Sequence, residues 1–170
     1  MKIEELFEKK SEKPGTYAGV HFSPETVRSI QDFMKKHSVP HPVDDDKLHT
    51  TVLYSRKHCP NFEARGDIKP PIFGEAEEFA IWPSRSGTNC LVLKYKCPDL
   101  VARHKALMDE HNATYDFPEY VPHVTFSYDS GDLDVATLNT ERALKSLAKL
   151  EIVNEYGEDL NEDWANNSST

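Results

Sequence analysis

The sequence lacks any long apolar run, and this lack excludes one broad class of proteins. No stretch of its 170 residues approaches the roughly 18 to 20 apolar residues that a membrane-spanning helix needs. The opening segment, MKIEELFEKKSEKPG, is charged and amphipathic, whereas a secretory signal would carry an apolar segment. We therefore expect a protein that works in the cytoplasm and has no membrane partner.

Cysteine is also scarce, and its spacing fits neither of its usual structural uses. The three cysteines, Cys59, Cys90 and Cys97, are odd in number and form no CxxC pair. This pattern disfavours both a disulfide framework and a structural zinc site, so we expect reduced thiols. With 38% hydrophobic and 29% charged residues, residues 1–170 should fold as one soluble domain with its own core.

Basic residues are missing from the end of the chain. From Glu151 onward there are six acidic residues and no Lys or Arg, although the net charge of the whole chain is -9. Without this segment, the chain contains 23 acidic and 20 basic residues. Such a body can still hold a small phosphate ligand, but it should not wrap long nucleic acid. We expect residues 155–170 to form an acidic tail, either a frayed terminus or a lid that carries Trp164.

The sequence repeats itself once, with a constant offset of 74 residues and no insertion. The offset places Pro24 on Pro98, Val27 on Val101, Met34 on Met108, His37 on His111, His49 on His123, Thr51 on Thr125 and Tyr54 on Tyr128. A repeat of this kind indicates two copies of one supersecondary unit. The two units run from about residue 17 to 55 and from about residue 91 to 129.

Each unit is predicted to be a strand, a helix, a loop and a second strand. The first strands are expected at YAGVHF and CLVLKYK, and the helices at SPETVRSIQDFMKKH and CPDLVARHKALMDEH. Proline suits the first turn of a helix because its missing N–H costs nothing there, and Ser23 is a candidate N-cap. We also expect a bridge strand near residues 79–82, a helix over residues 134–150 and a strand over residues 149–157.

The second strands carry the same short motif, HTTV in one unit and HVTF in the other. Side chains two residues apart share a face of a strand. This alternation places His49, Thr51, Leu53 and Ser55 on one face, and His123, Thr125, Ser127 and Asp129 on one face of the other strand. We predict an α+β fold with two pseudo-symmetric lobes of antiparallel sheet and outer helices, around a central cleft lined by two histidines and two threonines.

Such a pair of histidines suits acid–base chemistry. Imidazole has an ordinary pKa near 6.5, so one ring can accept a proton while the other donates one. The threonine hydroxyls can donate hydrogen bonds to the nonbridging oxygens of a phosphate. The predicted catalytic residues are therefore His49, Thr51, His123 and Thr125, with no metal and no cofactor.

Three other interpretations use the same residue types. A zinc site would need a third ligand, and candidates such as Asp129 or Cys90 have no recognisable spacing. Catalysis by a cysteine and a histidine is disfavoured because no cysteine lies in an activating sequence context. A purely structural role suits an isolated strand histidine, but two His-x-Thr elements in register within a repeat weaken that interpretation.

The two motifs, in halves that repeat strand, helix and strand, resemble the 2H phosphoesterase superfamily. Its motif is His, an apolar residue, Thr or Ser, then an apolar residue, and the resemblance covers roughly Tyr17 to Val153. The first copy departs from the motif because Thr50 occupies the apolar position, which affects only local packing. The chain length, the segment GTYAGVHFSPETV and the acidic tail look like those of the phage anti-CBASS phosphodiesterases.

This resemblance implies a monomeric enzyme that degrades the cyclic di- and trinucleotide signals of bacterial antiviral defence. One histidine would activate a ribose 2′-hydroxyl for attack on the adjacent phosphodiester, and the other would protonate the 5′-oxygen leaving group. A 2′,3′-cyclic phosphate would form and then be hydrolysed. The alternatives are an RNA-processing 2H phosphoesterase that acts on 2′,3′-cyclic phosphate ends or 2′–5′ linkages, a binding protein that sequesters the nucleotide without cutting it, and a structural or interaction protein.

Base recognition is expected from flat rings at strand ends. Tyr17 and Trp82 are candidate stacking platforms, although Trp82 also suits a core position. Glu151 can accept a hydrogen bond from an adenine amine or can lie in solvent. Three basic residues, Lys94, Lys96 and Arg85, can each pair with phosphate, and the sequence does not rank them.

Overall fold

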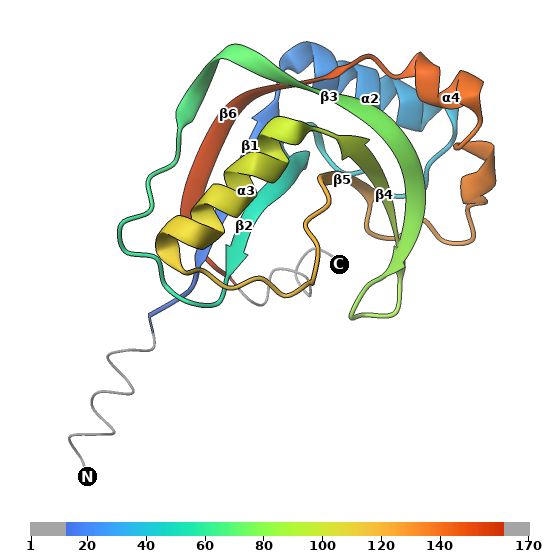
Figure 1. The fold of residues 1–170 in the computed structure, drawn as a ribbon. Coiled ribbons are helices and arrows are strands. Elements are labelled where there is room, and N and C mark those ends of the chain that lie inside the picture. The colour runs from blue at the N-terminus through green and yellow to red at the C-terminus, as the bar shows by residue number, and fades with distance from the viewer. Residues whose placement is uncertain (1–12, 162–170) are drawn as a thin grey trace.

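The structure is a computed structural model, drawn in Figure 1, and it describes residues 13–161. Its strands and α-helices are, in chain order, β1 (Thr16–Phe22), α2 (Pro24–Lys36), β2 (His49–Ser55), β3 (Gly66–Pro83), β4 (Asn89–Lys96), α3 (Pro98–His111), β5 (His123–Ser127), α4 (Glu141–Ser146) and β6 (Leu150–Asp159). Both predicted strand–helix–strand units are present, as β1–α2–β2 and β4–α3–β5. The candidate lid with Trp164 lies outside the described residues.

The strands form one six-stranded antiparallel sheet in the order β2-β1-β6-β3-β4-β5. From one edge the order is β2, β1 and β6, and from the other edge it is β5, β4 and β3. In both cases the second strand of a unit lies at the edge, the first strand of that unit lies beside it, and a central strand follows. The central strands are β6 for the first unit and β3 for the second. The α+β class is therefore confirmed, and the two predicted lobes are the two ends of this single sheet.

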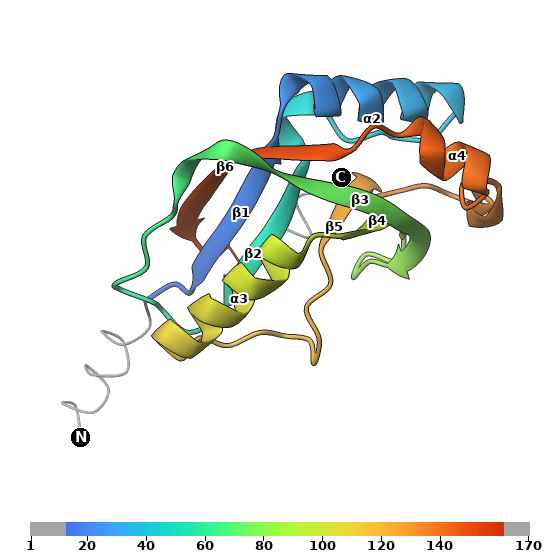
Figure 2. The same ribbon diagram turned by 45° about the horizontal axis from the view of Figure 1, so that its top comes forward.

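Each helix of the repeat packs against the strands of the other unit. Helix α3 contacts β2, and it lies alongside β1 and β2 in both views (Figures 1 and 2). In α2, the ring of Phe33 stacks on Phe79 of β3 and meets Phe126 of β5 edge-on, with ring centroids 5.2 and 6.1 Å apart. Because the helices are exchanged in this way, neither unit has a complete core of its own.

The outer edges of β2 and β5 are also covered by the opposite unit. An edge strand leaves main-chain groups without a partner unless another segment supplies one. The hydroxyl of Tyr120, before β5, donates to the carbonyl of Thr51 in β2 at 2.6 Å. The amide of Val43, before β2, donates to the carbonyl of Phe126 in β5 at 2.8 Å. The loop before each edge strand thus covers the other edge strand.

The bridge strand is longer than predicted. We expected a strand near residues 79–82, whereas β3 runs from Gly66 to Pro83. Its first part pairs with β6 and its second part with β4, and it curves from one end of the sheet to the other (Figure 1). This one strand therefore joins both ends of the sheet into one layer.

The helix predicted over residues 134–150 was wrong in extent, because only Glu141–Ser146 is α-helical. Asn139 uses its side chain to bond both main-chain groups of Phe79, at 2.6 and 2.9 Å, which ties the preceding segment to β3. Thr140 then caps a new helix by accepting a hydrogen bond from Ala143. Within residues 13–161, no helix has the length and apolar character of a membrane span.

The acidic tail begins later than residue 155, because β6 continues to Asp159 and the side chain of Glu155 is fully buried. Its carboxylate lies 2.9 Å from Arg65 Nε and 2.8 Å from Arg103 Nη2. Burial by itself raises the pKa of Glu155, but the hydrogen bonds and charges of Arg103 and Arg65 outweigh it and hold that pKa below its usual range. This ion triad connects β6 to α3 and to the segment before β3.

Replacing Glu155 by Gln should lower the free energy of unfolding by about 3–5 kcal/mol, because Arg65 and Arg103 would lose the negative charge of their shared buried carboxylate. A depressed folded-state pKa stabilises the protein above the unfolded-state value of about 4.3, and this stabilisation is lost as the pH falls through the folded-state value. Urea denaturation across acidic pH should therefore show a steeper loss of stability for the wild type than for Glu155→Gln.

The control is Glu141→Gln, since Glu141 forms an exposed i,i+4 pair with Lys145. Exposed pairs of this kind contribute little, so the control should resemble the wild type. Equal losses of stability in the two variants would contradict the assignment of a structural role to the buried triad.

Candidate functional site

His49 and His123 are the first residues of β2 and β5, and their rings are anchored in the same way. Nδ1 of His49 lies 2.8 Å from the carbonyl of Lys47, and Nδ1 of His123 lies 3.0 Å from the carbonyl of Val121. Because a carbonyl oxygen only accepts, Nδ1 carries the proton in each neutral ring. Nε2 of each neutral imidazole therefore carries the lone pair and is able to accept a proton.

The two anchored histidines are brought together by contact between β2 and β5. Thr50 Oγ1 donates to the carbonyl oxygen of His123 at 2.9 Å, although the two residues lie at opposite edges of the sheet order. The structure thus places both His-x-Thr strands side by side, as the repeat predicts. We call the side of the sheet that carries His49 and His123 the histidine face.

Each His-x-Thr strand contains a bulge, which corrects the expected alternation beyond the threonine. The register skips Val52 in β2 and Phe126 in β5, and these positions are one repeat apart. An extra residue reverses the side to which later side chains point. Leu53, expected on the histidine face, is therefore fully buried in the core, while the ring of Tyr54 meets that of Tyr17 edge-on at 6.4 Å.

The same correction applies to the second unit. Ser127, also expected on the histidine face, is fully buried and donates to the carbonyl of Pro40 at 2.6 Å. Tyr128 takes its place and hydrogen-bonds Thr125; burial raises the pKa of Tyr128 to about 12 in spite of this bond. The bulge therefore directs a tyrosine toward Thr125 of the second motif.

Tyr17 supports the threonine of the first unit in a similar way. Its hydroxyl lies 2.8 Å from Thr51 Oγ1, and its ring meets that of His49 edge-on at 6.3 Å. Burial, followed by the nearby Tyr156, raises the pKa of Tyr17 well above its ordinary value, so the phenol keeps its proton at neutral pH. Both threonines of the His-x-Thr motifs are thus held by a protonated tyrosine, a contact that the sequence did not predict.

Trp82 lies against His123. The ring centroids are 4.7 Å apart with an interplanar angle of 65°, and 37% of the residue is exposed. This exposure does not fit a core position, the alternative that the sequence left open. The indole borders the histidine face, where a base-stacking role stays a prediction.

Glu151 occupies β6 opposite Phe73, and its main chain bonds Ser23 and Thr26 at the start of α2. No hydrogen bond or ion pair within residues 13–161 connects its carboxylate to the His-x-Thr strands. Its predicted contact with a base therefore rests on the sequence alone.

The three basic candidates are placed differently from one another. Lys94 lies opposite His123 in the sheet and pairs with Glu78 at 2.6 Å. Lys96 has a side chain that is 68% exposed and pairs with Glu77 at 3.6 Å. Arg85 lies exposed in the turn between β3 and β4. Of the three, Lys94 is the one next to a predicted catalytic residue.

The sequence interpretation missed His21 and Tyr156. His21 lies opposite His49 in the pairing of β1 with β2, and its ring stacks on Tyr156 at 4.3 Å and 15°. Strand alternation could have identified His21, because it shares a face with Tyr17. Tyr156 had no such signal, since only the tertiary structure places β6 beside β1. A Cβ at Gly19 would come within 2.7 Å of its hydroxyl, so glycine leaves the space that the Tyr156 side chain occupies.

The environment of His123 favours its neutral form. Burial lowers the pKa of His123 most; the hydrogen bond to Val121 opposes this effect, and the charge of His49 adds to it. Burial also lowers the pKa of His21, with a further contribution from His49. A neutral imidazole near physiological pH can act as a proton acceptor.

Metal and cysteine chemistry find little support in the described part of the chain. Residues 13–161 contain no group of three or more His, Cys, Asp or Glu side chains placed to hold a metal ion. All three cysteines are buried. Burial raises the pKa of the Cys90 thiol, which disfavours the reactive thiolate.

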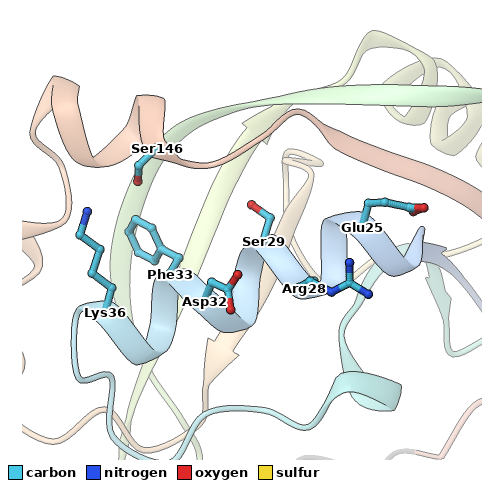
Figure 3. A pocket seen from close by; sticks show the side chains of 7 residues that line it. All are labelled: Glu25, Arg28, Ser29, Asp32, Phe33, Lys36 and Ser146. Carbon is cyan, nitrogen blue, oxygen red and sulfur yellow. The ribbon is translucent and has the colours of Figure 1, made fainter.

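An open groove of about 380 Å³ between α2 and α4 lies outside the histidine face (Figure 3). Acidic and basic side chains alternate along the α2 side of this groove, which is lined by Glu25, Arg28, Ser29, Asp32, Phe33, Lys36 and Ser146. None of the predicted catalytic or base-binding residues lines it. The histidine face, on which the two His-x-Thr strands meet, is the candidate active site.

Comparisons with known sequences give one consistent family. The family model of the anti-CBASS protein Acb1 matches residues 14–167. The anti-CBASS protein Acb1 of Vibrio phage KVP40 is 34% identical over 165 residues, which cover 92% of this chain and 95% of the phage protein. The anti-CBASS protein Acb1 of Enterobacteria phage T4 is 31% identical, with 94% and 97% covered.

Solved structures show the same fold at low identity. E. coli LigT complexed with phosphate has a TM-score of 0.53 and 17% identity, and the match covers 89% of this chain and 91% of LigT. The apo form of E. coli LigT has a TM-score of 0.51 and 21% identity, with 72% and 76% covered. These matches confirm the 2H phosphoesterase-like architecture.

The histidine face makes a prediction about protonation. In an NMR titration, His123 should have a pKa below the ordinary value of about 6.5, because burial disfavours the imidazolium form. Trp82→Ala should raise this pKa by exposing the ring, whereas Trp82→Phe, which keeps an apolar cover, should change it less. Since the folded-state pKa is lowered, protonation favours the unfolded chain, and His123 reduces stability as the pH falls below about 6.5. A His123 pKa at or above 6.5 in the wild type would contradict the burial argument.

Proposed function

Because the chain belongs to the Acb1 family of anti-CBASS proteins, we propose that it is a metal-independent phosphodiesterase of cyclic nucleotides. Its substrates would be cyclic di- and trinucleotide messengers such as 3′,3′-cyclic GMP-AMP, opened at a 3′–5′ bond in the cytoplasm of the infected bacterium. Opening the ring would remove the signal that activates the CBASS defence.

The observation that carries this proposal is the matched presentation of two imidazoles. Each has Nδ1 bonded to a carbonyl two residues earlier, and each strand continues into a threonine whose hydroxyl meets a tyrosine. Two such groups can serve opposite sides of one phosphorus, one accepting a proton and the other donating one. This arrangement supports in-line transfer at a phosphodiester.

In the proposed first step, Nε2 of one neutral histidine takes the proton of a ribose 2′-hydroxyl. The 2′-oxygen then bonds to the adjacent phosphorus, and the bond from phosphorus to the 5′-oxygen breaks. The second histidine, protonated beforehand, gives its proton to the departing 5′-oxygen. The products are a linear nucleotide with a 2′,3′-cyclic phosphate and a pair of histidines whose protonation states have been exchanged.

In the second step, the histidine roles reverse. The neutral ring takes a proton from water, the hydroxyl oxygen attacks phosphorus, and the other ring protonates the departing ribose oxygen. The pair then returns to its starting protonation state. Thr51 and Thr125 would donate hydrogen bonds to the nonbridging oxygens in both steps, and their tyrosine partners Tyr17 and Tyr128 would hold the hydroxyls in orientation.

We further propose that Trp82 stacks on a nucleobase beside the scissile phosphate, since its half-exposed indole borders His123. Tyr17, which contacts Thr51, is the second proposed stacking platform for a base. Glu151 is retained as a partner for an exocyclic amine. The protein would act as a monomer on a small nucleotide, with no long nucleic acid bound.

A substrate panel tests the reaction class. Wild-type protein incubated with EDTA and 3′,3′-cyclic GMP-AMP should linearise it at the rate seen without chelator, because the proposed steps use only side chains of the chain. Cyclic trinucleotides and an RNA with a 2′,3′-cyclic phosphate end, resolved by chromatography, complete the panel. Faster reaction on the RNA end would favour an RNA-processing enzyme, and recovery of every cyclic nucleotide unchanged would favour a sequestering protein.

Alanine variants test the assigned residues. His49→Ala and His123→Ala should each lower kcat by about 10²- to 10⁴-fold, the usual contribution of a general acid or base. Thermal unfolding should show that both variants remain folded. His58→Ala is the matched control, because His58 also bonds a main-chain carbonyl, that of Pro14, in a loop outside the histidine face. Wild-type activity in either catalytic variant would refute the assigned chemistry.

A further inference from the structure

Thr50 is a polar side chain on the interior side of β2. It lies opposite Val20 of β1, and only 1% of it is exposed. At the matching position of the second repeat stands the apolar Val124. A buried hydroxyl is unfavourable unless it is hydrogen-bonded, so the partners of Thr50 explain why it is tolerated.

Two hydrogen bonds hold the Thr50 hydroxyl in one orientation. Tyr95 Oη donates to it at 2.7 Å, and Thr50 Oγ1 donates to the carbonyl of His123 at 2.9 Å. The phenol has a single proton, which is directed at Thr50. The proton of Thr50 is consequently directed at His123.

The donor Tyr95 is firmly placed within the second half of the molecule. Only 2% of the residue is exposed, and a Cβ at Gly74 would lie 2.5 Å from its ring, so glycine in β3 leaves the space that the ring occupies. The amide of Tyr95 donates to the carbonyl of Pro122, the residue before His123, at 3.0 Å. Tyr95 therefore supports Thr50 and the start of β5 from the same side.

This hydrogen bond joins the two catalytic strands directly. β2 and β5 are the opposite edges of the sheet, and within residues 13–161 no ladder of main-chain hydrogen bonds pairs them. Thr50 follows His49 in the chain, and its bond ends on the carbonyl of His123 itself. Other contacts also join the two halves, but this bond runs from the residue beside one imidazole to the main chain of the other.

We infer that Thr50 is a positioning residue, which sets the separation of the His49 and His123 rings so that both reach the same phosphodiester. The inference rests on the proposed function, since it concerns the geometry of that reaction. Acid–base catalysis across one phosphorus tolerates little displacement, and a misplacement of about 1 Å can lower a rate by about 100-fold.

The test compares three variants in steady-state hydrolysis of 3′,3′-cyclic GMP-AMP. Thr50→Val keeps the shape and removes the hydroxyl, while Thr50→Ser keeps the hydroxyl. Ser127→Ala is the matched control, because Ser127 is a buried hydroxyl that also joins the two halves, at 2.6 Å to Pro40, but its bond does not end on a histidine.

Thr50→Val should lower kcat by about tenfold or more and change KM by less than about twofold, because the chemical step is misaligned while the bases still bind. Thr50→Ser should restore most of kcat. Ser127→Ala should lower the melting temperature by an amount similar to Thr50→Val and leave kcat unchanged. This split separates a role in alignment from a contribution to stability alone.

If the wild type is active and Thr50→Val and Ser127→Ala both have the wild-type kcat, the inference is overturned while the proposed function stands. A wild type that cleaves no cyclic nucleotide would overturn the proposed function, and the inference with it. If Thr50→Val does not fold, Tyr95→Phe provides the test, because it frees the Thr50 hydroxyl to rotate without removing it. That variant should lower kcat several-fold at constant KM, and a wild-type kcat would count against the inference.

Discussion

The contact between the two edge strands, β2 and β5, is the constraint on which the rest of this structure depends. An edge strand exposes carbonyls that need donors, and here the donors come from the opposite half of the chain. Tyr120 and the buried His104 serve consecutive carbonyls of β2, at Thr51 and Val52, at 2.6 and 2.8 Å. These two carbonyls lie at the bulge, where main-chain pairing is interrupted. Donors from the loop before β5 and from α3 therefore hold the edge strand β2 against the second half of the chain.

The exchange of helices makes this arrangement cooperative. Because α3 packs on β2 and α2 places Phe33 on Phe79 and Phe126, separating the halves would expose the core of both. The long strand β3 pairs with both β6 and β4, and the buried ion triad of Glu155 connects β6 to α3 and to the segment before β3. Such a frame suits the proposed reaction, in which two imidazole rings act on one phosphorus.

The repeat gives the site symmetric chemistry in asymmetric surroundings. Both histidines have the same anchor, and both threonines have a tyrosine partner. Beside His49, however, lies His21, stacked on a tyrosine, whereas beside His123 lie Trp82 and the ion-paired Lys94. The symmetric part matches the proton transfers of the proposed reaction, and the asymmetric part gives the two halves of the site different surroundings.

The sequence by itself determined the repeat, the two His-x-Thr strands, the helices α2 and α3 and the serine cap, because each depends on periodicity or on residues close in the chain. The tertiary structure alone decided that Leu53 is buried and that Tyr54 lies on the histidine side, since a bulge depends on the partner strand. It also decided that Glu155, within the predicted strand over residues 149–157, is buried in an ion triad, because its arginine partners are distant in sequence. Thr50 illustrates the difference: its position in the motif suggested only packing, and the carbonyl of His123 gave its hydroxyl a partner.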